Sequence, residues 1–295
     1  ILVGTASAAS NAPGIDEENK VVTVCAFTPV TGPVPFYTQL TDAADAYFQQ
    51  VNDAGGINGW EIEFVTMDDG YDPSRSVQVT RRLVEEHDIF ALAASVGTAT
   101  NVAVIPYAKD QKLPMVGPVG GSSKFYREEL VFPLLPDYGW SAAANARYAL
   151  DDLGAQRLAL LWENDELGRS AKRGIETYLE SRDDELAASI SFGVDTSDFS
   201  PHVQRLKNAD VDAVILFGSN AHLAGALRAA SNIGLESDWF APFFTADPST
   251  YKLAGDLLDG TYFSSWLLPV SSDNAQIKAY REGLQEYYPD NSVGV

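Results

Sequence analysis

The sequence has a single cysteine and only three histidines, and this scarcity removes several classes of site. Cys25 lies inside the apolar run 21–27 and has no second cysteine with which to form an internal disulfide or a metal site. The histidines are far apart in the chain, and none belongs to a paired metal-binding spacing such as HExxH. We therefore expect no metal and no cofactor, and we predict that Cys25 is a buried structural residue.

Basic residues and long apolar runs are also lacking. The chain has 20 Lys and Arg residues and 41 Asp and Glu residues, which gives a formal net charge of −21 and a pI near 4.3. Such a charge repels polyanions, so no nucleic acid and no anionic membrane surface is expected as a partner. No uninterrupted apolar stretch approaches the roughly 20 residues that a membrane-spanning helix needs.

The common catalytic motifs are missing as well. The sequence contains no GxSxG nucleophile elbow, no Walker A loop and no GxGxxG fingerprint. The acidic stretch 68–72 lacks the spaced ligands and closing glutamate of a calcium loop. It instead predicts a turn followed by a helix, with Asp72 as the cap and Pro73 in the first turn. We therefore do not expect an enzyme.

Length and periodicity predict two lobes. A chain of 295 residues favours two lobes of roughly 120 to 150 residues each. Apolar runs alternate with segments of helical period, as in a parallel sheet covered by helices. Strands are predicted at 21–27, 61–67, 89–95, 113–119, 157–163, 188–192 and 212–218. In the second half, helices are predicted at 141–154, 165–182, 201–210 and 221–234.

The predicted fold class is α/β, with two doubly wound Rossmann-like lobes joined by a multi-strand hinge. Strands near 240–244 and 261–266 finish the second lobe, and an amphipathic helix follows at 272–288. If this helix packs on the first lobe, the chain crosses between the lobes near 133–138 and 265–270. The predicted divisions are a signal remnant and tether at 1–20, lobe 1 at 21–136 with 270–295, and lobe 2 at 137–269.

Hydroxyl-bearing residues, glycines and aromatic residues gather where the predicted strands end. Open α/β sheets place their ligands at the carboxyl ends of strands, so the recurrence of such clusters in both halves predicts a binding site. The clusters lie at 31–37, 97–100, 117–123, 163–168, 218–220 and 243–247.

The junction SVGTATN, residues 95–101, joins a predicted buried strand to a helix whose first turn carries no charge. A helix start exposes unpaired N–H groups and a partial positive charge, so this junction is one candidate for an anion site. The alternative is that Thr98 or Thr100 simply caps the helix.

Five stretches in order carry a resemblance to a known family: TPVTGP; NDAGGINGWEIEFVTMDDGYDPSRSVQVTRRLVEE; GTATN with PYAKDQKLPMVGP; LALLWENDELGRSAKRGIE; and LKNADVDAVILFGSNAHLAGALRAASNIGL. On these stretches, spread from about residue 21 to 290, the sequence resembles the type I periplasmic binding proteins. The similarity is to the leucine/isoleucine/valine-binding branch, which serves ABC importers.

The resemblance implies two lobes that close on a small-molecule solute without performing chemistry. It implies an ABC transporter permease in the membrane as partner and a monomeric protein in the periplasm or at the cell surface. A lipid anchor would come from a segment before Ile1. Family members continue past the last predicted helix, so the resemblance also implies that a C-terminal part is missing.

The resemblance assigns candidate ligand contacts in lobe 1. In family members the segment that matches GTATN gives hydroxyl and N–H donors to a ligand carboxylate, which makes Thr98 the main candidate. The supporting candidates, through side chain or backbone, are Gly97, Thr100, Val119, Gly120, Gly121 and Ser122.

In lobe 2 the sequence departs from the amino-acid binders of the family. Where they place tyrosines, this chain has Leu167 and either Ser219 or Asn220. The position at which they have an ammonium-binding glutamate matches about Phe243 or Phe244 in this chain. A buried ammonium without a carboxylate partner costs several kcal/mol, which argues against a plain α-amino acid as the ligand.

Two alternatives follow from these departures. Asp247 or Glu163 could substitute for the missing glutamate. Otherwise a carboxylate with an apolar or aromatic body, stacked by Phe36, Tyr37 and Phe244, fits the lining better. For Phe243, a position in the core is the alternative to a ligand contact.

The predicted function is an extracytoplasmic receptor of an ABC importer. Its ligand would be a branched-chain or other amino acid, or an aromatic or aliphatic acid or amide. The alternative is a ligand-binding sensor domain of the same fold, which acts in signalling. A repressor is disfavoured, because no helix-turn-helix precedes residue 21 and the charge is wrong for DNA.

Overall fold

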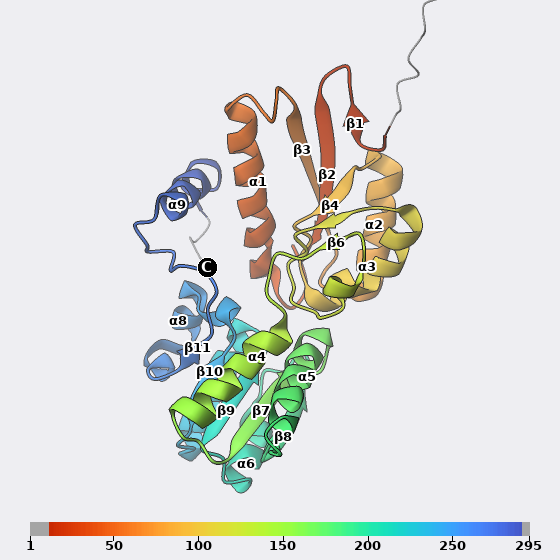
Figure 1. Cartoon of the computed structure of the whole chain (residues 1–295). Coiled ribbons are helices and arrows are strands. Elements are labelled where there is room, and N and C mark those ends of the chain that lie inside the picture. Colours follow the sequence, from red (N-terminus) through yellow and green to blue (C-terminus); the bar gives the residue numbers. More distant parts are fainter. Residues whose placement is uncertain (1–11, 291–295) are drawn as a thin grey trace, which may run out of the picture.

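The structure is a computed structural model that describes residues 12–290. Within these residues the chain forms two α/β lobes, one above the other in Figure 1, each built on a sheet with helices on both faces. Lobe 1 contains the first sheet, and lobe 2 contains the second.

The first sheet has the spatial order β3–β2–β4–β5–β6 with all of these strands parallel, and β1 pairs antiparallel with the start of β2. The strands are β1 (Ile15–Asp16), β2 (Val21–Thr28), β3 (Glu61–Asp68), β4 (Ala91–Ala93), β5 (Met115–Val116) and β6 (Val131–Phe132). The predicted strands 21–27 and 61–67 are confirmed. No strand was predicted at β1, which lies within the proposed tether; residues 1–11 of that tether lie outside the described residues.

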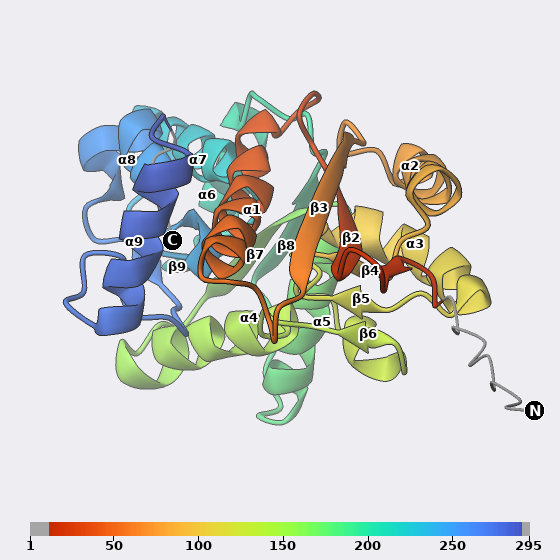
Figure 2. The same cartoon turned by 90° about the horizontal axis from the view of Figure 1, so that it is seen from above.

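Among the described residues, α1 (Thr38–Asp53), α2 (Pro73–His87) and α3 (Thr98–Gln111) cover the first sheet, and α9 (Ala275–Tyr287) packs on α1. Helices α2 and α3 pack together on one face, and α1 lies on the other face beside α9, as Figure 2 shows from above. As predicted, Cys25 is fully buried in the core beneath α2 and α3, and burial raises the pKa of its thiol to about 12. This thiol is therefore unreactive at neutral pH.

The second sheet is fully parallel, in the order β11–β10–β9–β7–β8. Its strands are β7 (Leu158–Glu163), β8 (Ala188–Phe192), β9 (Ala213–Phe217), β10 (Asp238–Ala241) and β11 (Tyr262–Phe263). Successive side chains of a strand point to opposite faces. Leu158 and Leu160 accordingly join the core under α4 and α5, whereas Leu161 joins the core under α6 and α7.

The helices of lobe 2 are α4 (Tyr138–Arg147), which continues as a π-helical segment (Tyr148–Asp152), α5 (Glu166–Glu180), α6 (Ser200–Asn208), α7 (Asn220–Ile233) and α8 (Pro248–Ala254). Short 3-10 turns occur at Pro35–Tyr37, Phe125–Arg127, Phe243–Thr245 and Gly255–Leu258. Helix α8 was not predicted.

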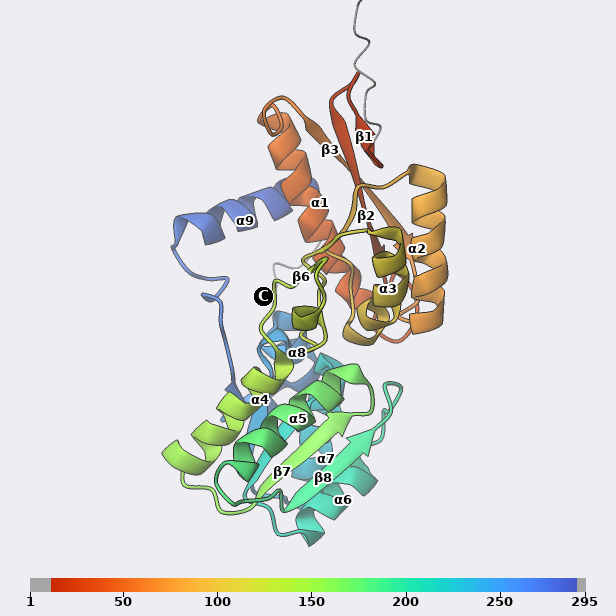
Figure 3. The same cartoon turned by 45° about the vertical axis from the view of Figure 1, so that its right-hand side comes forward.

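The chain passes from β6 to α4 and returns from β11 to α9 along an extended segment that Figure 3 shows clearly. The returning helix α9 packs on α1, where the Tyr287 hydroxyl donates to Asp53 and the Tyr288 hydroxyl donates to Asp45. The predicted packing of the last helix on lobe 1 is thus present in the structure. The division of the chain at residues 136/137 and 269/270 stays a proposal.

Candidate ligand-binding site between the lobes

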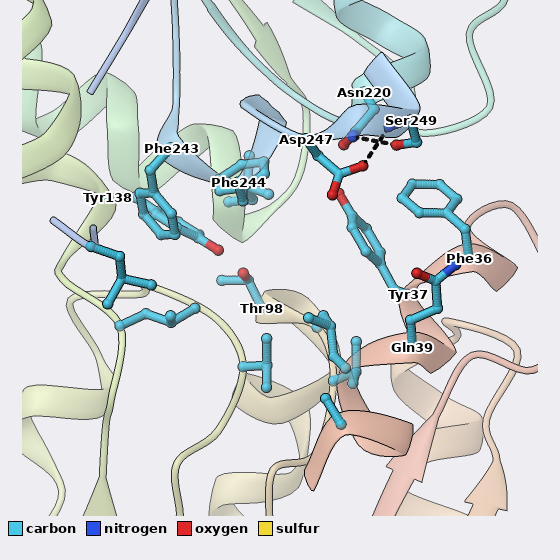
Figure 4. Close-up of a pocket in the computed structure, with 18 of the residues that line it drawn as sticks. Phe36, Tyr37, Gln39, Thr98, Tyr138, Asn220, Phe243, Phe244, Asp247 and Ser249 are labelled. Carbon is cyan, nitrogen blue, oxygen red and sulfur yellow. Dashed lines mark hydrogen bonds between the residues drawn. The ribbon is translucent and has the colours of Figure 1, made fainter. Parts of the chain in front are cut away.

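A cavity of about 170 Å³ lies between the two lobes (Figure 4). It opens at the carboxyl ends of β2 and β4 in lobe 1 and of β7 and β9 in lobe 2. In each sheet the strand order reverses between these two strands, and this is where doubly wound sheets form a crevice.

The floor of the cavity in lobe 1 is the start of α3. Gly97 precedes the helix with φ +107°, a conformation that side chains rarely adopt, and a Cβ there would meet the Tyr71 ring at 2.8 Å. Within residues 12–290, no side chain caps the first N–H groups of α3. The Thr100 hydroxyl instead donates inward to Val96 O at 2.8 Å. The alternative that Thr98 or Thr100 caps this helix is therefore wrong.

Thr98 is 1% exposed and lines the cavity. Its hydroxyl and that of Tyr138 point toward each other in Figure 4. Burial raises the pKa of the Tyr138 phenol well above its ordinary value, although a hydrogen bond with Thr98 opposes the shift. Burial likewise raises the pKa values of Tyr37 and Tyr71, with added repulsion from nearby acidic groups. These phenols are therefore neutral at physiological pH and can donate hydrogen bonds.

The roof of the cavity in lobe 2 is formed by the starts of α7 and α8. The Asn220 amide nitrogen donates to Ser249 Oγ at 2.9 Å, and its Oδ1 has no hydrogen-bond partner among the described residues. Asp247 caps α8 by accepting from the Ser249 N–H at 2.7 Å. Figure 4 shows the Tyr37 hydroxyl rising from lobe 1 toward the Asp247 carboxylate.

The remaining wall is mostly aromatic. The Tyr138 ring lies 5.4 Å from Phe244 and 6.3 Å from Phe243 between ring centroids. Phe243 belongs to the core of lobe 2 and also lines the cavity. Its position is therefore compatible with both alternatives, a core residue and a ligand contact. No Lys, Arg or His belongs to the described residues of the lining, and Asp247 is its only carboxylate.

The structure brings together more than half of the candidates named from the sequence. Those that line the cavity are Phe36, Tyr37, Gly97, Thr98, Val119, Leu167, Asn220, Phe244 and Asp247. Because no ligand contact is observed, their part in binding stays a prediction.

Four other candidates do not line the cavity because they are bonded elsewhere. Thr100 bonds Val96, and the Ser122 hydroxyl donates to Glu166 at 3.0 Å. Glu163 Oε2 lies 3.1 Å from His222 Nδ1, with both side chains almost fully buried. Ser219 caps α7 by accepting from the backbone N–H of His222 at 3.4 Å.

Gly120 and Gly121 lie behind the lining. A Cβ on Gly120 would meet Thr98, and a Cβ on Gly121 would meet the Tyr138 ring at 2.5 Å. These glycines therefore allow the side chains of Thr98 and Tyr138 to pack closely, and their predicted backbone contacts with a ligand stay a prediction.

Several lining residues were not named from the sequence: Gln39, Leu40, Ala43, Tyr71, Val96, Leu135, Tyr138, Ser249, Trp266, Leu267, Tyr280 and Leu284. Tyr71 lies in a motif that carried the family resemblance, DDGYDP, but was interpreted only as part of a turn. It has φ +59° in that turn, next to the strand end of β3.

Two lobes joined by separate chain crossings, with a cavity between the carboxyl ends of their sheets, define a two-lobed solute-binding protein. The sequence model of one family, described as periplasmic binding protein, matches residues 21–294. The chain belongs to this family, as the sequence predicted.

Individual relatives agree with this assignment. The Leu/Ile/Val-binding protein of Escherichia coli (strain K12) is 26% identical over 266 residues, which cover 88% of this chain and 71% of the relative. A crystal structure of a substrate-binding periplasmic protein from Ralstonia solanacearum is 27% identical, with a TM-score of 0.83 over 92% of this chain and 78% of that one.

A third relative is a solute-binding protein of an ABC transporter from R. palustris, solved in complex with 4-hydroxybenzoate. It is 21% identical, with a TM-score of 0.79 over 91% of this chain and 74% of that one, and it supports the fold. These relatives are binding proteins. The family suggests an extracytoplasmic location, and between residues 12 and 290 no helix is both long and apolar enough to cross a membrane.

Proposed function

We propose that this protein is the extracytoplasmic receptor of an ABC importer and binds a small carboxylate-bearing solute between its two lobes. The observation that carries the proposal is the uncapped start of α3, with the Thr98 hydroxyl beside it, at the floor of the cavity. Free N–H groups and the positive end of the helix dipole favour an anion at this position.

The carboxylate would be held by neutral donors, because the described lining contains no basic side chain. Hydrogen bonds to a charged group contribute roughly 1.5 to 3 kcal/mol each, so Thr98, Tyr138 and the α3 backbone suffice for a small anion. A neutral set of donors also lets the anion leave when the lobes open.

The apolar part of the solute would lie among the aromatic side chains. Tyr37, Phe244 and Trp266 line the cavity from both lobes, so a ligand that touches all three favours the closed arrangement. The names of the relatives agree with a small acid that has an apolar body: one is a Leu/Ile/Val-binding protein and another holds 4-hydroxybenzoate.

Closure around the solute would present surfaces of both lobes together to a membrane permease. The relatives are named as transport or binding proteins, which favours transport; the sensor alternative gains no support from them.

The test compares acids with the alcohols that lack the carboxylate. Phenylpropanoate against phenylpropanol, and leucine against leucinol, are titrated into the full chain by calorimetry. The acid in each pair is expected to bind at least about tenfold more tightly, because only the acid forms charge-assisted bonds with α3. Equal binding of acid and alcohol in both pairs overturns the proposal.

A further inference from the structure

Three titratable side chains lie together in lobe 2, near the carboxyl ends of β7 and β9. Glu163 ends β7, Asp165 directly precedes α5, and His222 lies in the first turn of α7. Glu163 and His222 are almost fully buried, and Glu163 Oε2 lies 3.1 Å from His222 Nδ1. The Asp165 N–H donates to Glu163 O at 2.8 Å. We call these three residues the Glu163 cluster.

The hydrogen bonds of His222 determine where the cluster can hold a proton. Its Nε2 lies 3.0 Å from Val194 O, which can only accept, so Nε2 carries a hydrogen. Its Nδ1 accepts from the Ser219 N–H at 3.1 Å, which completes the capping box of α7. The neutral ring has one lone pair on Nδ1, and the Ser219 N–H already uses it. Glu163 Oε2 therefore faces Nδ1 without a hydrogen between them unless the cluster takes up a further proton.

Asp165 is the second place for a proton. Burial, and then the negative charge of Glu163, raise the pKa of Asp165 to about 7, although N–H bonds from Gly168 and Leu167 and the charge of Arg169 oppose the shift. Asp165 is therefore partly protonated near neutral pH. Any further negative charge nearby increases its protonation.

The charge of the cluster reaches the cavity. Tyr37, Tyr71 and Tyr138 all line the cavity. Burial raises the pKa values of these three phenols, and the negative charge of Glu163 raises all of them further. Asp165 does the same for Tyr71 and Tyr138. A charge that acts on these phenols also acts on a carboxylate bound among them.

The surroundings of the cluster leave its charge largely uncompensated. The described lining of the cavity contains no Lys, Arg or His. Arg169 is a permanent cation, but its side chain is half exposed, so water screens its charge. The charged or titratable groups that face the cluster from the elements around it are Arg169 in α5, His202 in α6, Asp247 before α8 and the phenols of Tyr37, Tyr71 and Tyr138.

We propose that Glu163, Asp165 and His222 take up a proton when a carboxylate solute binds, so that the receptor holds an anionic solute more tightly in weakly acidic than in weakly alkaline solution. This inference rests on the proposed function, which places the carboxylate of the solute at the start of α3. A bound anion disfavours further negative charge in the cluster, and by linkage a proton in the cluster favours the anion. The affinity for the anion therefore falls as pH rises through the range in which the cluster loses its proton.

The test compares an acid with its neutral alcohol at pH 6, 7 and 8, by calorimetry on the full chain. Phenylpropanoate with phenylpropanol is one pair, and isocaproate with isohexanol is the other. All four probes keep their charge over this range. We expect the affinity for the acid to fall about fivefold or more from pH 6 to pH 8, while the affinity for the alcohol changes less than about twofold.

Proton uptake is measured directly by repeating the titrations at pH 7 in phosphate and in Tris. These two buffers differ in their heat of ionisation, so the difference in the observed heat reports the protons that binding takes up. We expect uptake with each acid and none with its alcohol. A merely structural role of the cluster would not produce this signal.

Three variants assign the proton. Asp165→Asn keeps the cap of α5 but cannot ionise, so it is expected to bind the acid with little change between pH 6 and pH 8. Glu163→Gln removes the repulsion that keeps Asp165 protonated and is expected to flatten the pH dependence too; it serves alone if Asp165→Asn does not melt cooperatively. Asp212→Asn is the matched control. Asp212 is exposed at the amino end of β9, where it accepts from two backbone N–H groups, and its replacement is expected to keep the wild-type pH dependence.

The outcomes distinguish the inference from the function beneath it. Acids that bind more tightly than their alcohols, but equally well at pH 6 and pH 8 and without proton uptake, overturn the inference and leave the carboxylate receptor standing. A full pH dependence that persists in the folded Asp165 and Glu163 variants also overturns it. Equal binding of acid and alcohol overturns the proposed function and the inference with it, and binding of no probe counts against both.

Discussion

Thr98 and Thr100 lie in the same turn of α3 but contact different parts of the molecule. Thr98 faces the cavity, whereas Thr100 is fully buried and bonds Val96 O. Thr98→Val is expected to weaken binding of a carboxylate ligand by about 1 to 3 kcal/mol, because a charge-assisted hydrogen bond is lost. Thr100→Val is the control: it should lower the melting temperature and leave the affinity unchanged. Calorimetry and thermal melts check both, and an unchanged affinity in Thr98→Val would remove this residue from the site.

The environment of Asp165 predicts a pH-dependent stability. Burial, and then repulsion from Glu163, raise the pKa of Asp165 to about 7, although its bonds from the Leu167 and Gly168 N–H groups oppose the shift. The native state therefore keeps a proton that the unfolded state loses near pH 4, so stability is lost as pH rises from about 4 to 7.

Asp165→Asn keeps the cap of α5 but cannot ionise. Its melting temperature relative to the wild type is therefore expected to rise as pH increases from 5 to 8. Thermal melts of both proteins in matched buffers measure this difference. A difference that stays constant across the range would show that Asp165 is ionised throughout.

The predictable part of the site consists of residues next to strand ends. Thr98 and Asn220 lie a few residues after the ends of buried strands, and the edge of a parallel sheet brings such positions together whatever the rest of the chain does. Tyr138, Trp266 and Tyr280 come from the chain crossings and from α9. Their positions depend on how the two lobes dock, and no local periodicity reports such long-range contacts.

At the scale of elements, α4 and α5 pack closely against each other in lobe 2. A Cβ added to Gly174 would fall well inside van der Waals distance of the Gly139 backbone, which cannot give way as a flexible side chain can. Gly139 follows Tyr138 in the chain, so this packing also sets the position of a cavity-lining ring.

Gly174→Ala is therefore expected to destabilise the protein by roughly 1 to 3 kcal/mol through overpacking. Gly283→Ala in α9 is the matched control, because the nearest atoms that a Cβ there would meet belong to the end of the flexible Gln50 side chain, which can move. Both changes gain the same helix propensity, about 1 kcal/mol, so the difference between them reports packing. Urea denaturation measures it, and equal stabilities of the two variants would contradict the expected clash.

The sequence located the long elements better than the short ones, for a physical reason. Strands β2, β7 and β9 are mostly apolar runs, β3 begins with alternating acidic and apolar residues, and all four were predicted nearly at their observed length. The predicted strand 113–119 shrinks to β5 because Pro114 and Pro118 lack the N–H groups of a ladder. Pro242 ends β10 in the same way, and α8 has too few residues to show a clear helical period.

For the whole molecule, a buried carboxylate bridges the lobes. Glu166 at the start of α5 accepts from Ser122 Oγ and Lys124 Nζ, both in lobe 1 and both at 3.0 Å, and from Arg173 at 2.8 Å. Burial alone would raise the pKa of Glu166, but the bonds from Arg173, Lys124 and Ser122 outweigh it and hold the pKa below its usual 4.5. The charge of Glu166 therefore favours the docked arrangement of the lobes at neutral pH.

Glu166→Gln keeps an acceptor but removes this charge. We expect a loss of about 1 to 2 kcal/mol at pH 7, reduced by the exposure of Lys124 and Arg173 to solvent, and a larger radius of gyration by X-ray scattering as the lobes separate more easily. Because the folded pKa is lowered, the stabilisation is lost as pH falls below 4.5, so the variant and the wild type should converge in acid. Glu180→Gln, an exposed change at the other end of α5, is the control. A stability difference that does not shrink at all as pH falls below 4.5 would contradict the role given to the charge of Glu166.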